Sequence, residues 1–263
     1  MMEKILTHTV TNRKLTEQLG WADFRGFSLL FDNPGNSLMP AAGNLQKIHC
    51  PFSTDESLQL YKSLDEALEA LNPFFLKGEY LFCALPTPSF HVTAWDGLND
   101  LNKSGLTPGK HICFQTFLDR LPDDLAIENE WIRPAFHSSL CKETHRLTFV
   151  FDGIRLWKNQ TLVAVLKPAD AASKIAFAAI ASRRSLLNAH YQALGPEMRE
   201  AFVPHVSLGY FANESEAKRA LPLLAQWQTV FRECASGKMI TFDSISGYGF
   251  TDMATFFKSI PQK

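Results

Sequence analysis

Two short segments of the chain carry the same arrangement of a histidine, an aliphatic residue and a hydroxyl residue. The first is "FHVTAW", with His91 and Thr93, and the second is "PHVSLGYF", with His205 and Ser207. Residues i and i+2 of a strand point to the same side, about 6.5–7 Å apart. If both segments are strands, each presents an imidazole and a hydroxyl on one face and apolar side chains on the other.

Two such strands placed across a cleft suit phosphodiester chemistry. One imidazole can act as general base toward water or a ribose hydroxyl, and the other, when protonated, can donate to the leaving oxygen. The two hydroxyls can donate hydrogen bonds to the non-bridging phosphate oxygens and stabilise the charge that develops on them. Because this arrangement requires neither a metal ion nor a cofactor, we expect neither.

A third His-x-hydroxyl segment, "FHSSLCKE" at His137, is a rival. Its middle residue is polar and it follows Pro134, so it resembles a two-faced strand less closely. The stricter pattern of histidine, aliphatic residue and hydroxyl residue occurs only twice in the chain. Spacing alone leaves two alternatives open, namely two ordinary half-exposed strands without catalysis, or a site that pairs His137 with His205.

The segments 89–95 and 203–210 resemble the paired motifs of the 2H phosphoesterase superfamily, which includes LigT-like enzymes and cyclic nucleotide phosphodiesterases. The resemblance implies one two-lobed domain over residues 1–263, with the motif strands lining a central cleft. It also implies metal-independent action on 2′,3′-cyclic phosphates or 2′,5′-phosphodiester bonds of nucleotides or RNA ends. An alternative is a non-catalytic module that binds a phosphorylated nucleotide or RNA end in the same cleft.

Site residues follow from this resemblance. It makes His91 and His205 the acid–base pair and Thr93 and Ser207 the phosphate-binding residues. The first motif departs from many members of the superfamily at Ala94-Trp95, where plain aliphatic residues are common.

Strand parity also assigns the aromatic residues that follow the two histidines. Trp95 lies four residues after His91, so we expect it on the cleft side, where it either stacks on a base or sugar or packs against a loop at the rim. By the same parity Tyr210 falls on the core side and is not a predicted site residue.

The elements around the motifs predict an α+β fold with antiparallel sheets rather than a doubly wound parallel sheet. One helix is expected after Ser53, with Glu56 as its capping-box partner, and another between Asp170 and Gly195. A third is expected after Asn213, interrupted or kinked at Pro222. Strands are expected at 79–86, 89–95, 111–121, 145–157, 161–168, 203–211, 238–250 and 254–260.

A helix followed by a His-x-hydroxyl strand occurs once in each half, which indicates a pseudo-symmetric, bilobal domain. Arg183-Arg184, in the second helix, is expected on its solvated face.

Composition limits the partners. The 263 residues carry a formal net charge of −1, which argues against a protein that coats long nucleic acid and allows a small nucleotide or RNA-end substrate. Five cysteines without a CxxC motif indicate free thiols in a reducing compartment. The segment "MMEKILTHTVTNRK" has no long apolar core and no run approaches a membrane span. We therefore expect a cytoplasmic protein without membrane association.

Overall fold

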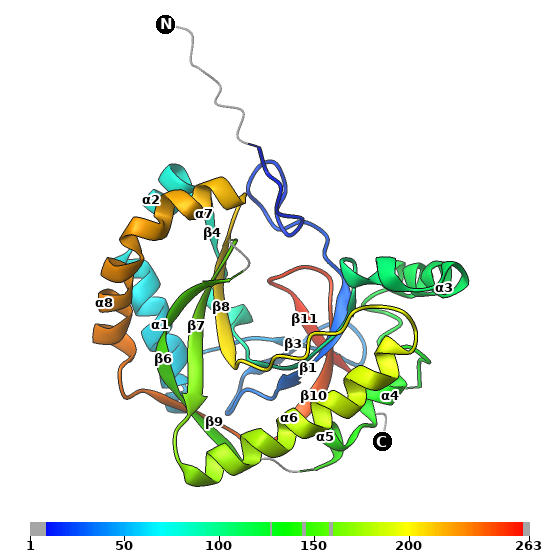
Figure 1. Ribbon diagram of the computed structural model, residues 1–263. Coiled ribbons are helices and arrows are strands. Elements are labelled where there is room, and N and C mark those ends of the chain that lie inside the picture. Colours follow the sequence, from blue (N-terminus) through cyan, green and yellow to red (C-terminus); the bar gives the residue numbers. More distant parts are fainter. Residues whose placement is uncertain (1–8, 127, 144–145, 158–159, 260–263) are drawn as a thin grey trace, which may run out of the picture.

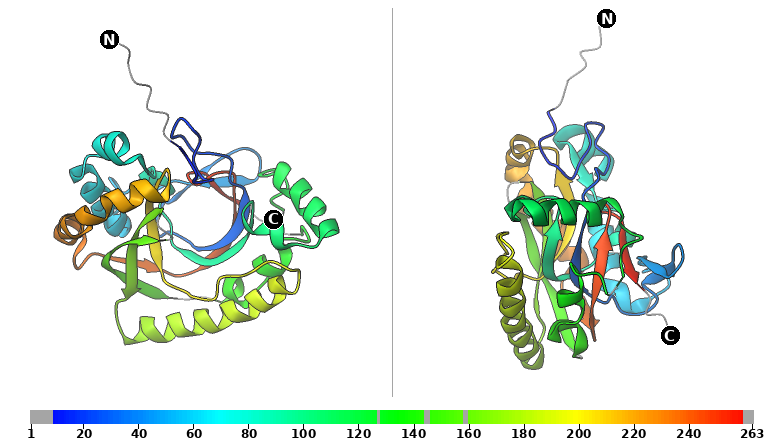
Figure 2. Two further views of the ribbon diagram at one scale, coloured as in Figure 1. Left: turned by 45° about the horizontal axis from the view of Figure 1, so that its top comes forward. Right: turned by 90° about the vertical axis from the view of Figure 1, so that its right-hand side faces the viewer.

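Two antiparallel sheets face each other across a central cavity, and helices cover their outer sides (Figure 1, Figure 2). The computed structural model describes residues 9–126, 128–143, 146–157 and 160–259. The architecture is α+β and bilobal, as predicted. Residues 1–8 of the N-terminal segment and the predicted strand ends His145 and Ile260 lie outside the described residues.

The first sheet has six strands in the order β2-β3-β11-β10-β1-β5. Their bounds are β1 Gly26–Phe31, β2 Leu38–Pro40, β3 Leu45–Ile48, β5 Thr93–Asn99, β10 Ile245–Phe250 and β11 Phe256–Ser259. The second sheet has five strands in the order β4-β8-β7-β6-β9. Their bounds are β4 Phe82–Ala84, β6 Leu147–Trp157, β7 Thr161–Pro168, β8 His205–Phe211 and β9 Met239–Phe242. Each sheet thus contributes one motif strand, β5 or β8, to the cavity.

Aromatic packing holds the helices on the first sheet. Strand β1 is buried along its whole length. Its Phe27 ring lies 6.2–6.4 Å from the rings of Phe114, Phe117 and Phe136. Phe114 and Phe117 belong to α3 (Pro108–Asp119), so the predicted strand at 111–121 is wrong. Pro108 occupies the first turn, and the buried residues recur at helical rather than alternating spacing.

The long helix α6 (Ala171–Gln192) begins where the sequence predicts. The Asp170 side chain accepts a hydrogen bond from the backbone N–H of Ser173, which satisfies an otherwise unpaired donor of the first turn. Near the cavity, α6 packs beneath the loop that leads to β8 (Figure 1).

The other helices cover the second sheet and the remaining outer surface. They are α1 (Gln59–Ala70), α2 (Pro73–Tyr80), α4 (Arg133–Phe136), α5 (Ser139–Lys142), α7 (Glu214–Ala220) and α8 (Leu224–Ala235). Asn213 caps α7 as predicted, and Pro222 lies in the short 3₁₀ turn that separates α7 from α8. Ser53 is not the cap of the first helical segment, because the Asp55 side chain accepts from Ser57 N instead.

Two further expectations can be compared with the described residues. All five cysteines are free thiols, as predicted. None of the described helices combines the length and the apolar character needed to cross a membrane.

Candidate active site

The cavity between the sheets has a volume of about 610 Å³, within the usual range for small-molecule sites. Its lining includes His91 and Thr93 from the first motif and His205 and Ser207 from the second. The structure thus brings all four residues together at one cavity, although 114 positions separate the two histidines.

The two imidazoles have matching hydrogen bonds. His91 Nδ1 lies 2.8 Å from the Ser89 carbonyl oxygen, and His205 Nδ1 lies 2.9 Å from the Val203 carbonyl oxygen. A carbonyl oxygen can only accept, so Nδ1 carries the proton and donates in both cases. The second nitrogen, Nε2, is therefore the one that accepts a proton when the imidazole is neutral and donates it when the imidazole is charged.

Each imidazole also lies against an aromatic ring. The ring centroids of His91 and Phe256 are 4.3 Å apart, and those of His205 and Trp157 are 4.2 Å apart. Burial among such groups disfavours the charged form and lowers the pKa of both histidines to about 4. The backbone carbonyls and the charge of Asp96 oppose this pKa shift, but they are weaker than the desolvation.

Strand β5 is bulged immediately after Thr93. Thr93 pairs with Leu30 whereas Trp95 pairs with Leu29, so Ala94 is an extra residue in β5. The bulge shifts the alternation of faces by one residue. Trp95 consequently points into the core, with 0% exposure, and Asp96 lines the cavity instead.

The predicted cleft-side position of Trp95 is therefore wrong. Its ring centroid lies 6.2 Å from that of Phe27 and 5.0 Å from that of Tyr191. Its indole Nε1 donates a 2.8 Å hydrogen bond to Asn188 Oδ1 of helix α6. Trp95 anchors the motif strand to α6 and is not one of the described residues that line the cavity.

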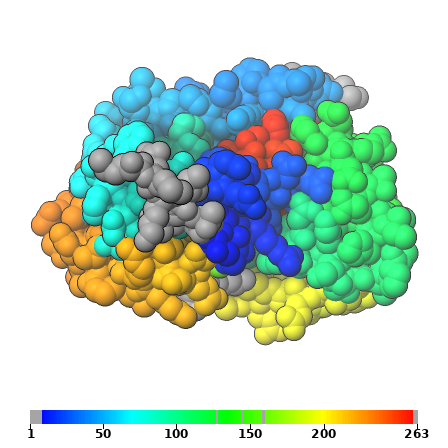
Figure 3. All heavy atoms as spheres, turned by 90° about the horizontal axis from the view of Figure 1, so that it is seen from above, coloured from blue at the N-terminus to red at the C-terminus, as the bar shows by residue number. Residues whose placement is uncertain are grey.

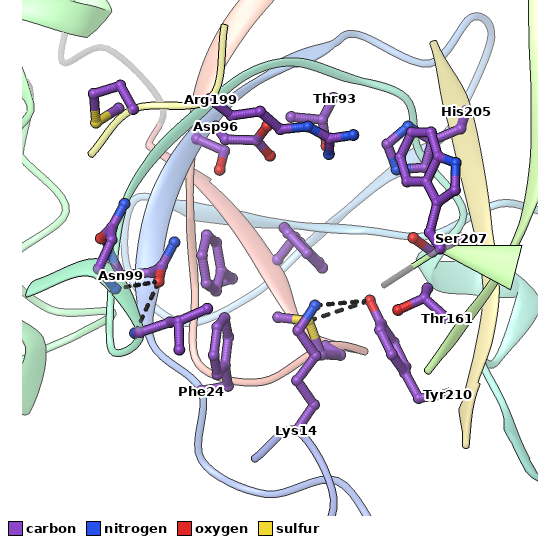
Figure 4. Close-up of a pocket in the computed structure, with 18 of the residues that line it drawn as sticks. Lys14, Phe24, Thr93, Asp96, Asn99, Thr161, Arg199, His205, Ser207 and Tyr210 are labelled. Carbon is purple, nitrogen blue, oxygen red and sulfur yellow. Dashed lines mark hydrogen bonds between the residues drawn. The ribbon is translucent and has the colours of Figure 1, made fainter. Parts of the chain in front are cut away.

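Strand β8 has an equivalent bulge. Val163 pairs with Ser207 and Leu162 pairs with Gly209, so Leu208 is the extra residue. Tyr210 therefore lines the cavity. The core-side position predicted for it from regular strand alternation is wrong. Its hydroxyl accepts a 3.2 Å hydrogen bond from Lys14 Nζ (Figure 4).

A glycine lies shortly after each bulge: Gly209 directly follows Leu208, and Gly97 lies at a second register shift of β5, between Asp96 and Asn99. A Cβ at Gly209 would lie 2.5 Å from the Cys83 carbonyl oxygen of β4, and one at Gly97 would overlap the Phe27 carbonyl oxygen of β1. Only glycine allows such close backbone approach. Glycine inside a strand is a recognised sign of a bulge, so "WDG" and "SLG" are the sequence signals that could have revealed Asp96 and Tyr210.

Lys14 reaches the cavity from the N-terminal segment 9–25. The backbone N–H groups of Thr11 and Asn12 donate to the Ala212 carbonyl at the end of β8. Phe24 N donates to Thr251 O beyond β10. The segment thus crosses from one sheet to the other. Figure 3, which views the molecule from above, shows it in dark blue over the middle of that face.

Arg199 supplies a second cation, from the loop between α6 and β8. Its guanidinium lies 4.5 Å from the Trp157 ring centroid, and its carbonyl accepts a 3.0 Å hydrogen bond from Asn188 Nδ2. Arg199 and Asp96 lie at one end of the cavity in Figure 4, and Lys14 and Tyr210 at the other. No sequence motif marks either cation, because the position of each depends on how a loop is folded over the sheets.

Arg184 is buried, with 2% exposure, so the expectation of a solvated face is wrong for this residue. Its guanidinium donates to the Ala94 carbonyl, at the bulge, and to the Arg199 carbonyl at 3.4 Å. Arg184 therefore connects the bulge in the first motif with the loop that presents Arg199.

His137 lies outside the cavity. It follows the short helix α4, its side chain is 44% exposed, and its Nε2 is 3.9 Å from a Glu128 carboxylate oxygen. It does not contribute to the cavity lining, so the rival pairing of His137 with His205 is wrong. In the described part of the chain, no three His, Cys, Asp or Glu side chains gather in a way that could hold a metal ion.

Comparison with known proteins identifies similar folds only. No protein-family model matches the chain, and no curated protein matches it in sequence. A conserved protein of unknown function, ATU0111 from Agrobacterium tumefaciens, is similar with a TM-score of 0.53 and 13% identity over 93% of this chain and 88% of that one. Usb1 from Kluyveromyces marxianus has a TM-score of 0.39 and 9% identity over 91% of this chain and 98% of that one. At such identities the first similarity concerns the fold alone.

Proposed function

We propose that the protein is a metal-independent phosphodiesterase of the 2H phosphoesterase superfamily. Its substrates are the 2′,3′-cyclic phosphates or 2′,5′-phosphodiester bonds of nucleotides or RNA ends. The observation that carries the proposal is the matched pair of imidazoles at one cavity, each with Nδ1 donating to the carbonyl two residues earlier. This arrangement leaves two Nε2 atoms for a base and an acid.

Hydrolysis of a cyclic phosphate uses one neutral and one protonated imidazole. The neutral Nε2 takes a proton from water as the water oxygen forms a bond to phosphorus. The bond between phosphorus and one ribose oxygen breaks, and the other imidazolium gives its Nε2 proton to that oxygen. The product is a phosphomonoester beside a free hydroxyl, and exchange of protons with solvent restores the starting forms.

Polar groups around the histidines support binding of the phosphate. The Thr93 and Ser207 hydroxyls line the same cavity as the histidine of their own motif and donate to the non-bridging oxygens in the proposed complex. Lys14 and Arg199 add positive charge at the two ends of the cavity, which favours an anionic substrate.

The deciding experiment is alanine substitution of each histidine. His91→Ala and His205→Ala should each lower turnover of nucleoside 2′,3′-cyclic phosphates or 2′,5′-dinucleotides by about 10²–10⁴-fold, the usual contribution of a general acid or base. His137→Ala is the matched control and should retain wild-type turnover, because His137 lies outside the cavity.

Two outcomes would contradict the proposal. Near-normal turnover in either cavity variant would remove the acid–base assignment. Tight binding of cyclic nucleotides or RNA ends by the wild type, with no product at high protein concentration, would instead identify a non-catalytic binding module.

A further inference from the structure

Asp96 places a carboxylate in a cavity that otherwise suits anions. It lies on β5 opposite Ser28 of β1, and the bulge at Ala94 turns it toward the cavity. Among the described residues, no hydrogen bond or ion pair engages its side chain. A half-buried negative charge next to a phosphate site costs binding energy, so its position calls for another explanation.

The cations at the cavity oppose protonation of the imidazoles. After burial, which has the largest effect, Lys14 lowers the pKa of His91, and Arg199 lowers the pKa of His205. The two histidines are also close enough that His91 lowers the pKa of His205 further. Buried Arg184 adds a further positive charge near Asp96.

Asp96 acts on both imidazoles in the opposite direction. Its charge raises the pKa of His91 and that of His205, although less than burial lowers them. Glu197 is the other carboxylate in the cavity lining, and its side chain is exposed. It is not one of the charged groups that raise or lower the pKa of His91 or His205. Removal of Asp96 would therefore leave the imidazoles surrounded by positive charge.

We infer that Asp96 is a positioning residue that supplies the counter-charge for the protonated histidine, so that this imidazole can act as general acid. The inference rests on the proposed function. The carboxylate transfers no proton itself. The proton passes from the imidazolium Nε2 to the leaving oxygen, and Asp96 stabilises the charged form before that transfer.

This role predicts opposite effects on binding and on chemistry. Without the carboxylate, a bound phosphate meets less repulsion and binds more tightly. The imidazolium is then less populated at neutral and alkaline pH, so chemistry slows. A residue with a merely structural role would weaken both.

The test compares Asp96→Asn with Glu197→Gln, two isosteric changes that each remove one negative charge from the cavity lining. For Asp96→Asn we expect KM, and the inhibition constant for inorganic phosphate, to fall several-fold. We expect kcat at pH 8 to fall about tenfold, the effect of about one unit of pKa, with a smaller loss at pH 5. Glu197→Gln should change neither the pH profile of kcat nor the histidine titrations.

An activity-independent measurement separates this inference from the proposed function. The imidazole Cε1–H signals are titrated by NMR with saturating sulfate, which does not itself titrate, and are assigned with His91→Ala and His205→Ala. Asp96→Asn should lower at least one imidazole pKa by about one unit, and unchanged pKa values would overturn the inference. If wild-type protein hydrolyses no phosphodiester, the proposed function fails while the titration still reports on Asp96. Should Asp96→Asn not fold, Asp96→Ser takes its place.

Discussion

Asp96 and Tyr210 occupy equivalent positions in the two halves of the cavity. Each follows the hydroxyl residue of its motif by three positions, after a bulge that inserts one residue into the strand. In regular strands both side chains would point to the opposite face. The two motifs therefore match in their backbone irregularity as well as in sequence, and the cavity receives a carboxylate from one half and a phenol from the other.

The motif hydroxyls should affect chemistry more than other hydroxyls of the cavity. Thr93→Val and Ser207→Ala each remove one proposed donor to the phosphate oxygens, and turnover should fall by about 10²–10³-fold, as for other preorganised donors. Thr161→Val is the matched control, since Thr161 lines the cavity from β7 outside the motifs. Steady-state kinetics on a cyclic nucleotide will measure all three. Equal losses in Thr161→Val and Thr93→Val would contradict a special role for the motif residues.

We expect kcat/KM to be highest at acidic pH and to fall as the pH rises. Burial lowers the pKa of both free histidines to about 4, so the required imidazolium is lost as pH rises through that value. The profile of kcat should extend to higher pH, because the bound phosphate favours the charged imidazole. Kinetics between pH 4 and 9 will measure both, and a kcat/KM that rises from pH 5 to 8 would contradict the expectation.

The same burial should make the fold sensitive to acid. Unfolded histidines take up protons near their ordinary pKa of 6.5, whereas the folded ones resist down to about 4. Stability from these groups is therefore full above pH 6.5 and falls as the pH drops toward 4, by at most about 3 kcal/mol for each imidazole. Urea unfolding at pH 7 and pH 4.5 will measure the loss, which should be smaller in His205→Ala. An equal loss in that variant would assign the acid sensitivity to other groups.

Trp95 should matter for stability rather than for recognition of the base. Trp95→Phe removes the hydrogen bond to Asn188 Oδ1 and leaves a buried acceptor without its donor, at a cost of about 1–3 kcal/mol. The urea midpoint should fall, while the ratio of KM values for purine and pyrimidine cyclic nucleotides stays unchanged. A changed KM ratio with unaltered stability would mean that the tryptophan contacts substrate after all.

Removal of metal ions should leave turnover unchanged. The proposed route assigns both proton transfers to imidazoles and charge stabilisation to hydroxyls and cationic side chains. Activity after exhaustive dialysis against EDTA should therefore equal activity before it, and loss of activity that added Mg²⁺ or Mn²⁺ restores would contradict the route.

Much of the fold followed from local patterns. The structure confirms the predicted caps at Asp170 and Asn213 and the break at Pro222, because each depends on neighbouring residues alone. The strand predicted at 111–121 is instead the helix α3, since a short apolar run does not by itself distinguish a buried strand from a helix. Strand β1, which lies between β10 and β5 in the first sheet, carries no distinctive pattern because both of its faces are buried.

The sequence by itself determined which residues can carry chemistry. Each motif places its hydroxyl residue two positions after its histidine, and this short spacing keeps both residues of each pair, His91 with Thr93 and His205 with Ser207, on the cavity side.

Only the tertiary structure decided which other side chains line the cavity next to these residues. Because of the bulge at Ala94, Asp96 lines the cavity in place of Trp95, and because of the bulge at Leu208, Tyr210 lines it as well. Lys14 and Arg199 came from segments packed over the sheets. Alternation of faces is a local property that holds only until a bulge interrupts it, and bulges and loop packing are set by long-range contacts such as that of Arg184 with Ala94.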